Sequence, residues 1–345
     1  HAVSVACWPN VAYRLYSSDG QPDGEPNDAL LTGFTDAGWT HGGFHTGYDV
    51  VCQWMYVKDL TGITNGKELL ASFGKRAQWS VKRAQSMGVH VREIGPDEFD
   101  VFADIERRTG ERRGFATRGA DYFRQFKQAY GADAHFMLAE IHIAEYVADM
   151  TAKREALQAK VARLQAKYDE RPTTRIERQL GEESRNLAAA DKRLAEVEGY
   201  ARKGDVLPAA ASMFVSHPNE VVYQYSGSLE EYKPFYASAL IQYEAMLHLC
   251  VEKGVPRYNF YGISGVFDDP NDEGRGVLEF KQGFNGYVEQ MVGKFTLPVD
   301  KFRFSWRSGD EPMWAASRLT VHPPCAYLRI CSHAHQRVSH SHHHQ

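Results

Sequence analysis

The sequence lacks the features that mark membrane-spanning, secreted and disulfide-rich proteins. No run of 18 apolar residues occurs in the 345-residue chain, so no transmembrane helix is predicted. The opening residues HAVSVACWPN have neither a basic flank nor a sustained apolar stretch, and so do not resemble a signal peptide. The 5 cysteines are scattered at positions 7, 52, 250, 325 and 331, which suggests reduced thiols rather than a disulfide framework. These absences predict a cytoplasmic protein.

Several catalytic signatures are also missing. The chain has no G-x-S-x-G nucleophile elbow, and the Q/R-x-x-G-x-G/A loop that binds the coenzyme A pyrophosphate is not apparent. The composition is that of an ordinary globular protein, with 43% hydrophobic and 24% charged residues, a net charge of −4 and a mean hydropathy of −0.48. There is room for two domains. No cofactor is expected.

Short strands and helices alternate along the chain, which predicts an α/β (α+β) fold. Helices are predicted at 29–37 (capped by Asp28), 65–73, 76–87, 96–109 and 232–253, and strands at 39–44, 53–57, 89–93, 209–215 and 221–225. The helix 76–87 is basic. Its Arg76, Lys82 and Arg83 could contact phosphate or tRNA, although we favour a merely exposed cationic face.

The middle segment, 151–203, follows a different pattern. Apolar residues recur at heptad spacing on both sides of Pro172, where a helix must break. They are Leu157, Val161, Leu164, Tyr168, Ile176, Leu180, Leu187, Leu194 and Val197. Two heptad helices joined by one turn predict an antiparallel coiled-coil arm.

The predicted arm is the basic element of the chain. It holds 13 Lys and Arg against 9 Asp and Glu, a net charge of +4, which leaves −8 for the remaining residues. On charge alone, a solvated coiled-coil face and a nucleic-acid contact are about equally good explanations.

The segment 257–295 contains the strongest candidate for chemistry. It reads as a buried strand (Tyr258–Ile263), a loop rich in Gly, Asp, Pro and Asn, and a second short strand (Val277–Lys281). In that second strand Lys281 follows Phe280 among apolar neighbours. A lysine buried there without a partner would cost several kcal/mol. We therefore expect Lys281 to face a cleft that holds an anion.

Three ordered motifs resemble the Fem family, the aminoacyl-tRNA-dependent transferases that add amino acids to peptidoglycan precursors. The segment just described resembles the family's F-x-G-I-S-G strand followed by F-K-x-G-F. Residues 54–93 resemble its W-x-V-x-D-L segment and the helix and strand R-x-x-(I/V)-K-(K/R)-A-x-x-x-G-V-x-V-(R/K). Residues 223–243 resemble its Y-x-x-G-S and (L/I)-Q-(W/Y) segment. The similarity runs from about Leu30 to Phe302.

The resemblance implies tandem GNAT-like (acetyltransferase-like) domains with the arm inserted in the second. On this basis residues 1–95 are the C-terminal part of the first domain, 96–150 and 204–303 form the second, 151–203 form the arm, and 304–345 form a His-rich tail outside the family pattern. Roughly the first hundred residues of a typical member are expected to be absent. Many members carry such an arm, and its similarity to the tRNA-binding arm of seryl-tRNA synthetase implies the same role.

The tail offers Cys325, Cys331, His333 and His335 as metal ligands, but its C-x5-C-x-H-x-H spacing is not that of usual structural zinc sites. We favour an unrelated appendage and expect no metal.

The resemblance also assigns site residues. It places Lys281 and Phe280 at the reaction centre, where the ammonium group of Lys281 suits an oxyanion or a substrate phosphate. Arg118 and Tyr122 match residues that hold the precursor's diphosphate, and their spacing of four would put them on one face of a helix. Tyr232, which lies 49 residues before Lys281, matches a third precursor-binding residue.

The implied function is transfer of an amino acid from aminoacyl-tRNA to the side-chain amine of a peptidoglycan stem peptide, building the interpeptide bridge. The acceptor would be lipid II, which would bring the protein to the membrane surface, or UDP-MurNAc-pentapeptide. The donor ester is already activated, so no enzyme nucleophile is needed. A non-catalytic protein that binds tRNA or the cell-wall precursor is the alternative. An acyl-CoA N-acyltransferase is disfavoured because its pyrophosphate loop is not apparent.

Overall fold

The structure, a computed structural model, describes residues 2–300 and is organised by two β-sheets. In the described residues the larger sheet has nine strands in the order β3-β2-β11-β5-β10-β9-β8-β7-β6, and the smaller has the order β1-β12-β4. The strands are β1 (Ser4–Cys7), β2 (Ala12–Tyr16), β3 (Pro22–Asp23), β4 (Thr40–His41), β5 (Trp54–Asp59), β6 (Val89–Glu93), β7 (Ala134–His142), β8 (Val206–His217), β9 (Glu220–Ser228), β10 (Arg257–Ile263), β11 (Tyr287–Met291) and β12 (Phe295–Pro298).

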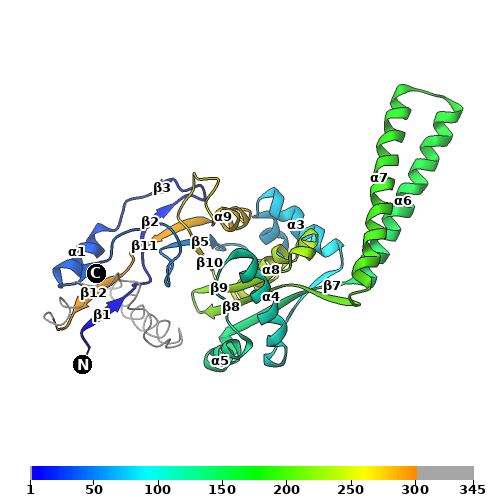
Figure 1. Ribbon diagram of the computed structural model, residues 1–345. Helices are drawn as coiled ribbons and strands as arrows, with labels where there is room; N and C mark the ends of the chain where they lie inside the picture. The colour runs from blue at the N-terminus through cyan, green and yellow to red at the C-terminus, as the bar shows by residue number, and fades with distance from the viewer. Residues whose placement is uncertain (1, 301–345) are drawn as a thin grey trace.

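Helices lie along the large sheet and extend away from it (Figure 1). They are α1 (Asp28–Asp36), α2 (Gly66–Ala71), α3 (Lys75–Ser86), α4 (Phe99–Arg113), α5 (Ala120–Tyr130), α6 (Ile143–Glu170), α7 (Thr174–Ala201), α8 (Ala237–Ala245) and α9 (Arg275–Gln282). Short 3-10 helices and one π-helical turn complete the described part.

The large sheet is mixed and crosses the predicted boundary between residues 95 and 96. β10 pairs parallel with β9 and antiparallel with β5, and β5 pairs on its other side with β11. Two late strands of the described part, β10 and β11, therefore lie on either side of the early strand β5. The α/β expectation is confirmed, whereas the division into two GNAT-like domains stays a prediction.

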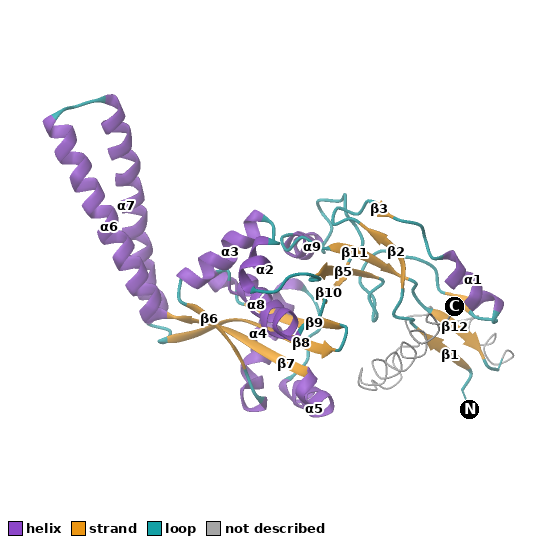
Figure 2. Ribbon diagram, turned by 180° about the vertical axis from the view of Figure 1, so that it is seen from behind, coloured by secondary structure: helices purple, strands orange, loops and turns teal. Residues whose placement is uncertain are grey.

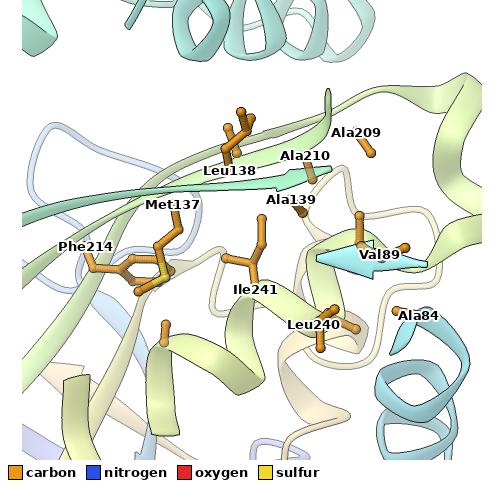
Figure 3. Packing of buried hydrophobic residues seen from close by; sticks show 14 of the residues in the cluster. Ala84, Val89, Met137, Leu138, Ala139, Ala209, Ala210, Phe214, Leu240 and Ile241 are labelled. Carbon is orange, nitrogen blue, oxygen red and sulfur yellow. The ribbon is translucent and has the colours of Figure 1, made fainter. Parts of the chain in front are cut away.

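The core lies on both faces of the strands around β7. β7 is buried along most of its length because helices cover it from both sides, so its sequence is nearly continuously apolar. Figure 3 shows Ile241 of α8 beside Met137 and Ala139 of β7 and Leu240 near Val89 of β6, while Leu138 points to the opposite face. Figure 2 shows α3 and α8 on one side of these strands and α5 on the other.

The predicted arm is a hairpin of two long helices, α6 and α7, that projects from the body (Figure 1). Ion pairs between Arg154 and Asp191 and between Lys160 and Glu183 join the two helices. The hairpin begins at residue 143 rather than 151, because β7 ends at His142 and α6 starts at the next residue. Coiled-coil packing in the strict sense stays a prediction.

The base of the hairpin belongs to the core. Tyr146, Met150 and Val197 are 5%, 2% and 3% exposed and join the main hydrophobic cluster. At its base the hairpin therefore packs against the body as well as against itself.

Other boundaries also differ from the sequence prediction. The segment 232–253 is not one helix: a 3-10 helix (η3, Glu230–Phe235) that contains Pro234 precedes α8, and a π-helical turn (η4, Met246–Cys250) and a 3-10 helix (η5, Val251–Lys253) follow it. Tyr236 interrupts the run with a left-handed backbone, φ 56°. The strand expected at 39–44 shrinks to β4, and Asn27 caps α1 in place of Asp28.

Phe136 on β7 provides a test of this core. Its side chain is fully buried, with ring centroids 4.1 Å from Phe99 and 5.2 Å from Phe102. We expect Phe136→Ala to lower the free energy of unfolding by about 3–5 kcal/mol, because it leaves a cavity that rigid neighbours cannot fill. Urea unfolding followed by circular dichroism measures this. Val101→Ala on the exposed side of α4 is the control, and should change stability by less than about 0.5 kcal/mol. Similar losses in the two variants would contradict the proposed core.

Candidate active site

Lys281 lies on a helix, not on the predicted strand. Residues 275–282 form α9, where Leu278 and Lys281, three residues apart, both face inward, and Arg275 and Glu279, four apart, form an ion pair of 2.8 Å on the outside. The buried residues thus recur at a helical spacing, which is difficult to recognise in a sequence of only eight residues. The glycines at 274 and 283 flank the helix.

The surroundings of Lys281 also differ from the predicted anion-holding cleft. The side chain is 4% exposed. Its Nζ donates hydrogen bonds to the carbonyl oxygens of Gly262 at 2.6 Å and Tyr261 at 3.4 Å. These carbonyls belong to a bulge in β10, where Tyr261 has φ 62° and the pairing with β5 shifts register. The ammonium group therefore satisfies backbone groups that the irregular strand leaves without their usual partner.

Burial controls the protonation of this lysine. Desolvation lowers the pKa of Lys281 to about 7, while the neighbouring Cys52 opposes the shift. Cys52 is itself buried, and desolvation raises its pKa. Near neutral pH the amine of Lys281 is therefore divided between its charged and neutral forms, a state suited to proton transfer or to stabilising a developing negative charge.

Phe280, the other predicted reaction-centre residue, contacts the aromatic core. Its half-buried ring lies 5.3 Å from that of Phe284, which packs against Phe260 and Phe73 at 5.2 and 5.0 Å. Phe280 therefore fixes α9 to the aromatic core.

A row of tyrosines extends from the β10 bulge toward Arg118. Burial, with Cys52 and Tyr225 among its neighbours, raises the pKa of Tyr261 to about 12. The hydroxyl of Tyr225 lies 3.1 Å from that of Tyr122, and the guanidinium of Arg118 lies 5.3 Å from the centre of the Tyr122 ring. The structure thus links the predicted residues Arg118 and Tyr122 to the region of Lys281 through two tyrosines that the sequence did not single out.

Arg118 and Tyr122 meet for a reason other than the one predicted. α5 starts at Ala120 after Gly119, so Arg118 precedes the helix instead of sharing a helical face with Tyr122. Its backbone N–H donates to Glu106 on α4, which is 3% exposed and has one oxygen, Oε2, without a hydrogen-bond partner in the structure. Desolvation raises the pKa of Glu106 to about 7, against the opposing effects of Arg118. Glu106 thus positions the loop that carries Arg118.

Exposed Arg113, at the end of α4, adds a second guanidinium that the sequence analysis missed. Its positive charge acts on Tyr48 and Tyr223, whose pKa values burial raises. The run Arg112-Arg113 offered a signal, but nothing local distinguishes it from an ordinary cationic helix end.

Tyr232 is placed apart from the other candidates. Its ring is 5% exposed at the base of the arm, with Lys203 Nζ 5.4 Å above it and Tyr200 at 5.9 Å. Among the contacts of residues 2–300, none joins Tyr232 to Arg118, Tyr122 or Lys281. A precursor-binding role for Tyr232 stays a prediction.

A pocket of about 330 Å³ opens beside the loop that follows β10. It is lined by Asp19, Gly20, Gln21, Thr46, Gly265, Val266, Phe267 and Asp268. Gly265 is three residues from Gly262, the acceptor of the Lys281 hydrogen bond. The two aspartates make the pocket acidic, whereas Arg118 places a cation beside Tyr122.

One group of potential metal ligands occurs in the described part of the chain. His90, His142 and Glu145 each place a ligand atom within 4.8 Å of the others. His90 Nε2 lies 2.7 Å from Glu145 Oε2, and the hydrogen bond lowers the pKa of Glu145. This hydrogen bond by itself accounts for the close approach of His90 and Glu145. The candidate ligands Cys325, Cys331, His333 and His335 lie outside the described residues.

Within residues 2–300, the structure contains no helix with the length and apolar character of a membrane span.

The comparisons with known proteins agree with the motif resemblance. A sequence profile of the FemAB family matches residues 1–308. Aminoacyltransferase FemB of Staphylococcus epidermidis (strain ATCC 35984) is 34% identical over 300 residues, which cover 86% of this chain and 70% of that protein. Aminoacyltransferase FemA of Staphylococcus aureus (strain MRSA252) is 29% identical over 304 residues, covering 85% and 70%.

The crystal structure of FemX shares the fold. Its TM-score is 0.66 at 21% identity, over 88% of this chain and 74% of that one.

The depressed pKa of Lys281 predicts a specific pH dependence of stability. In the unfolded chain this lysine titrates near 10.5, and in the folded protein near 7. Between these values the unfolded state binds more protons, so the contribution of Lys281 to stability rises with pH, by up to about 1.4 kcal/mol per pH unit. We expect the free energy of unfolding of wild type minus that of Lys281→Met to increase from pH 7 to pH 9. Urea unfolding at each pH measures both. Parallel curves would contradict the buried, proton-releasing state of Lys281.

Proposed function

The chain belongs to the FemAB family, and from this we infer that it is an aminoacyltransferase that moves an amino acid from aminoacyl-tRNA to the stem peptide of a peptidoglycan precursor. The observation that carries the inference is the 34% identity to aminoacyltransferase FemB over 86% of the chain. The transfer forms a peptide bond at the side-chain amine of the stem and so builds an interpeptide bridge. The donor places the reaction in the cytoplasm.

The chemistry requires little of the enzyme beyond positioning and charge stabilisation. The acceptor amine attacks the carbonyl carbon of the aminoacyl ester and gives a tetrahedral oxyanion. The ester C–O bond then breaks, the amine loses a proton, and the ribose oxygen of the tRNA takes up a proton as it leaves. Two hydrogen bonds hold Lys281 Nζ on the β10 bulge, and in its charged form the ammonium group has a third N–H for the oxyanion. With a pKa of about 7, Lys281 can also exchange a proton during the step.

The acceptor would lie along the tyrosine row. Arg118 and Arg113 supply exposed guanidinium groups for the diphosphate of lipid II or UDP-MurNAc-pentapeptide. The hydroxyls of Tyr122 and Tyr225 suit sugar or phosphate oxygens. In this arrangement the stem peptide extends past the β10 bulge, and the acidic pocket that contains Asp19 and Asp268 attracts the protonated amine, which releases a proton to solvent before it attacks.

A non-catalytic binding protein is the second candidate, and the burial of Lys281 favours it. A lysine that is 4% exposed and bonded to two carbonyls could serve the fold alone. The two candidates predict different rates for variants of this residue.

We expect Lys281→Ala to lower the turnover number for transfer about 100- to 1000-fold, the usual loss when one positioned donor to an oxyanion is removed. Lys281→Arg should restore activity only in part, since a planar fork does not replace a compact ammonium group in a tight site. Charged tRNA and each acceptor are incubated with the protein, and the product is weighed by mass spectrometry. Circular dichroism checks the fold of each variant.

Lys58→Met is the matched control. Lys58 is also buried, at 3% exposure, and donates to a backbone carbonyl, that of Asn285, and desolvation lowers its pKa to about 8. Its replacement should reduce stability and leave turnover within a few-fold of wild type. If Lys281→Ala behaves like Lys58→Met, the catalytic role of Lys281 is wrong. If the wild-type protein gives no product with any donor, the enzyme inference itself fails.

The basic arm is proposed to bind the tRNA. Because residues near its base belong to the core, deletion of the whole segment 151–203 would damage the body. Replacing only residues 158–186 with a short Gly-Ser turn keeps the Arg154–Asp191 pair and the buried base. We expect this variant to remain folded and to bind tRNA more weakly, with a smaller dependence of affinity on salt, because fewer counterions are released. Equal binding at every salt concentration would show that the arm serves another purpose.

A further inference from the structure

The outer face of α3 combines exposed cations with an exposed tryptophan. We define the α3 face as Lys75, Arg76, Trp79, Lys82 and Arg83. The opposite side of the helix, with Ala77, Val81 and Ala84, is buried against the body. Spacings of three and four residues place the members of the face on one stripe. Arg83 is half-buried and the other four are exposed.

The charge of the α3 face is not balanced locally. No Asp or Glu occurs between Gly74 and Arg92 in the sequence. None of the ion pairs found in residues 2–300 involves Lys75, Arg76, Lys82 or Arg83. Four cations on three turns of helix repel one another and attract a polyanion.

Trp79 is exposed and oriented so that it can stack on a planar group. Its side chain is 53% exposed, unusual for the largest aromatic residue. Tyr236 contacts it edge to face, with ring centroids 4.9 Å apart and planes at 80°. This contact limits the motion of the indole, so that stacking costs little conformational entropy. Aromatic rings interleaved with cations are the arrangement by which proteins bind single-stranded nucleic acid.

The α3 face also connects the two parts of the molecule that the donor must reach. At its N-terminus, the Gly74 N–H donates to the carbonyl of Gly283 at 2.9 Å, two residues after Lys281. At the other end, Arg83 lies near Tyr146 at the base of the arm, where Arg193 of α7 acts on the same tyrosine. The 12 residues of α3 form a helix about 18 Å long, of which about 14 Å separates Gly74 from Arg83. Figure 1 shows α3 between α9 and the arm.

We propose that the α3 face binds the unpaired 3′ end of an RNA acceptor stem, with Trp79 stacked on a base and the flanking cations on phosphates. The proposal rests on the proposed function in that the RNA is the tRNA donor. Tryptophan and cations would also suit an anionic membrane surface. The position of the face between the arm and Gly283 favours RNA, because a membrane contact requires neither neighbour.

Binding by the full chain is measured with a fluorescent RNA hairpin that reproduces an acceptor stem with four unpaired 3′ nucleotides, and with the same hairpin cut blunt. We expect Trp79→Leu to weaken binding of the overhang hairpin about tenfold and that of the blunt hairpin less than twofold, because loss of one base–aromatic stack costs on this order. Trp79→Phe, which keeps a ring, should stay within about threefold of wild type.

The cations are tested together. Arg76→Gln combined with Lys82→Gln should reduce the slope of log affinity against log salt by about 1 to 2. Lys253→Gln, at an exposed lysine in η5 on another part of the surface, is the control and should leave both the affinity and the slope unchanged.

The outcomes separate the α3 face from the proposed function. If the wild-type protein transfers amino acids and Trp79→Leu binds both hairpins as wild type does, the α3 proposal is wrong and the transferase function stands. Co-sedimentation of the wild type, but not of Trp79→Leu, with phosphatidylglycerol vesicles, together with unchanged RNA binding, would identify a membrane surface instead. An overhang effect in a protein that forms no peptide product would support RNA binding while removing the transferase function.

Discussion

The contact between Lys281 and the bulge of β10 is the constraint on which the candidate site depends. An irregular strand in the middle of a sheet exposes carbonyl groups that must find donors in a region closed to water. Lys281 on α9 provides these hydrogen-bond donors. Because its amine is buried there, its pKa falls to about 7. The same contact sets the position of Tyr261, Gly262 and the loop that lines the acidic pocket. Lys281 thus has two properties at once: it donates hydrogen bonds that the backbone of β10 requires, and its amine has a lowered pKa.

Charges of opposite sign are separated around this centre. Arg118 stands at the far end of the tyrosine row, Arg113 acts on Tyr48 and Tyr223, and Asp19 and Asp268 line the pocket beyond the bulge. A precursor with an anionic diphosphate at one end and a cationic amine at the other matches this polarity. Glu106 supports this arrangement of charges, because its buried carboxylate accepts a hydrogen bond from the backbone N–H of Arg118 and so fixes the loop that carries the guanidinium group.

The arm is joined to the body more firmly than an independent hairpin would be. β7 passes into α6 without a linker, and Gly88 permits the close approach of the neighbouring turn: a Cβ there would lie 2.9 Å from the carbonyl oxygen of His142. Gly88 has φ 69°, a conformation that glycine adopts readily. The pair His90–Glu145 adds a side-chain link across the same joint. A movement of the arm would therefore be transmitted to the large sheet, next to α3 and its exposed cationic face.

By itself the sequence determined the features that follow from local pattern: the α/β class, β6 at residues 89–93, the helix around residues 76–86, the hairpin broken near Pro172, and, through ordered motifs, the family. It misjudged α9 as a strand, because eight residues hold too few turns for a helical period to be visible. Only the tertiary structure decided that Lys281 is buried on backbone carbonyls, that Tyr225 and Tyr261 link it to Arg118, and that Tyr232 packs at the base of the arm. These pairings join residues on different helices and strands, up to 103 positions apart, and register and burial, which fix them, arise only when the sheet assembles.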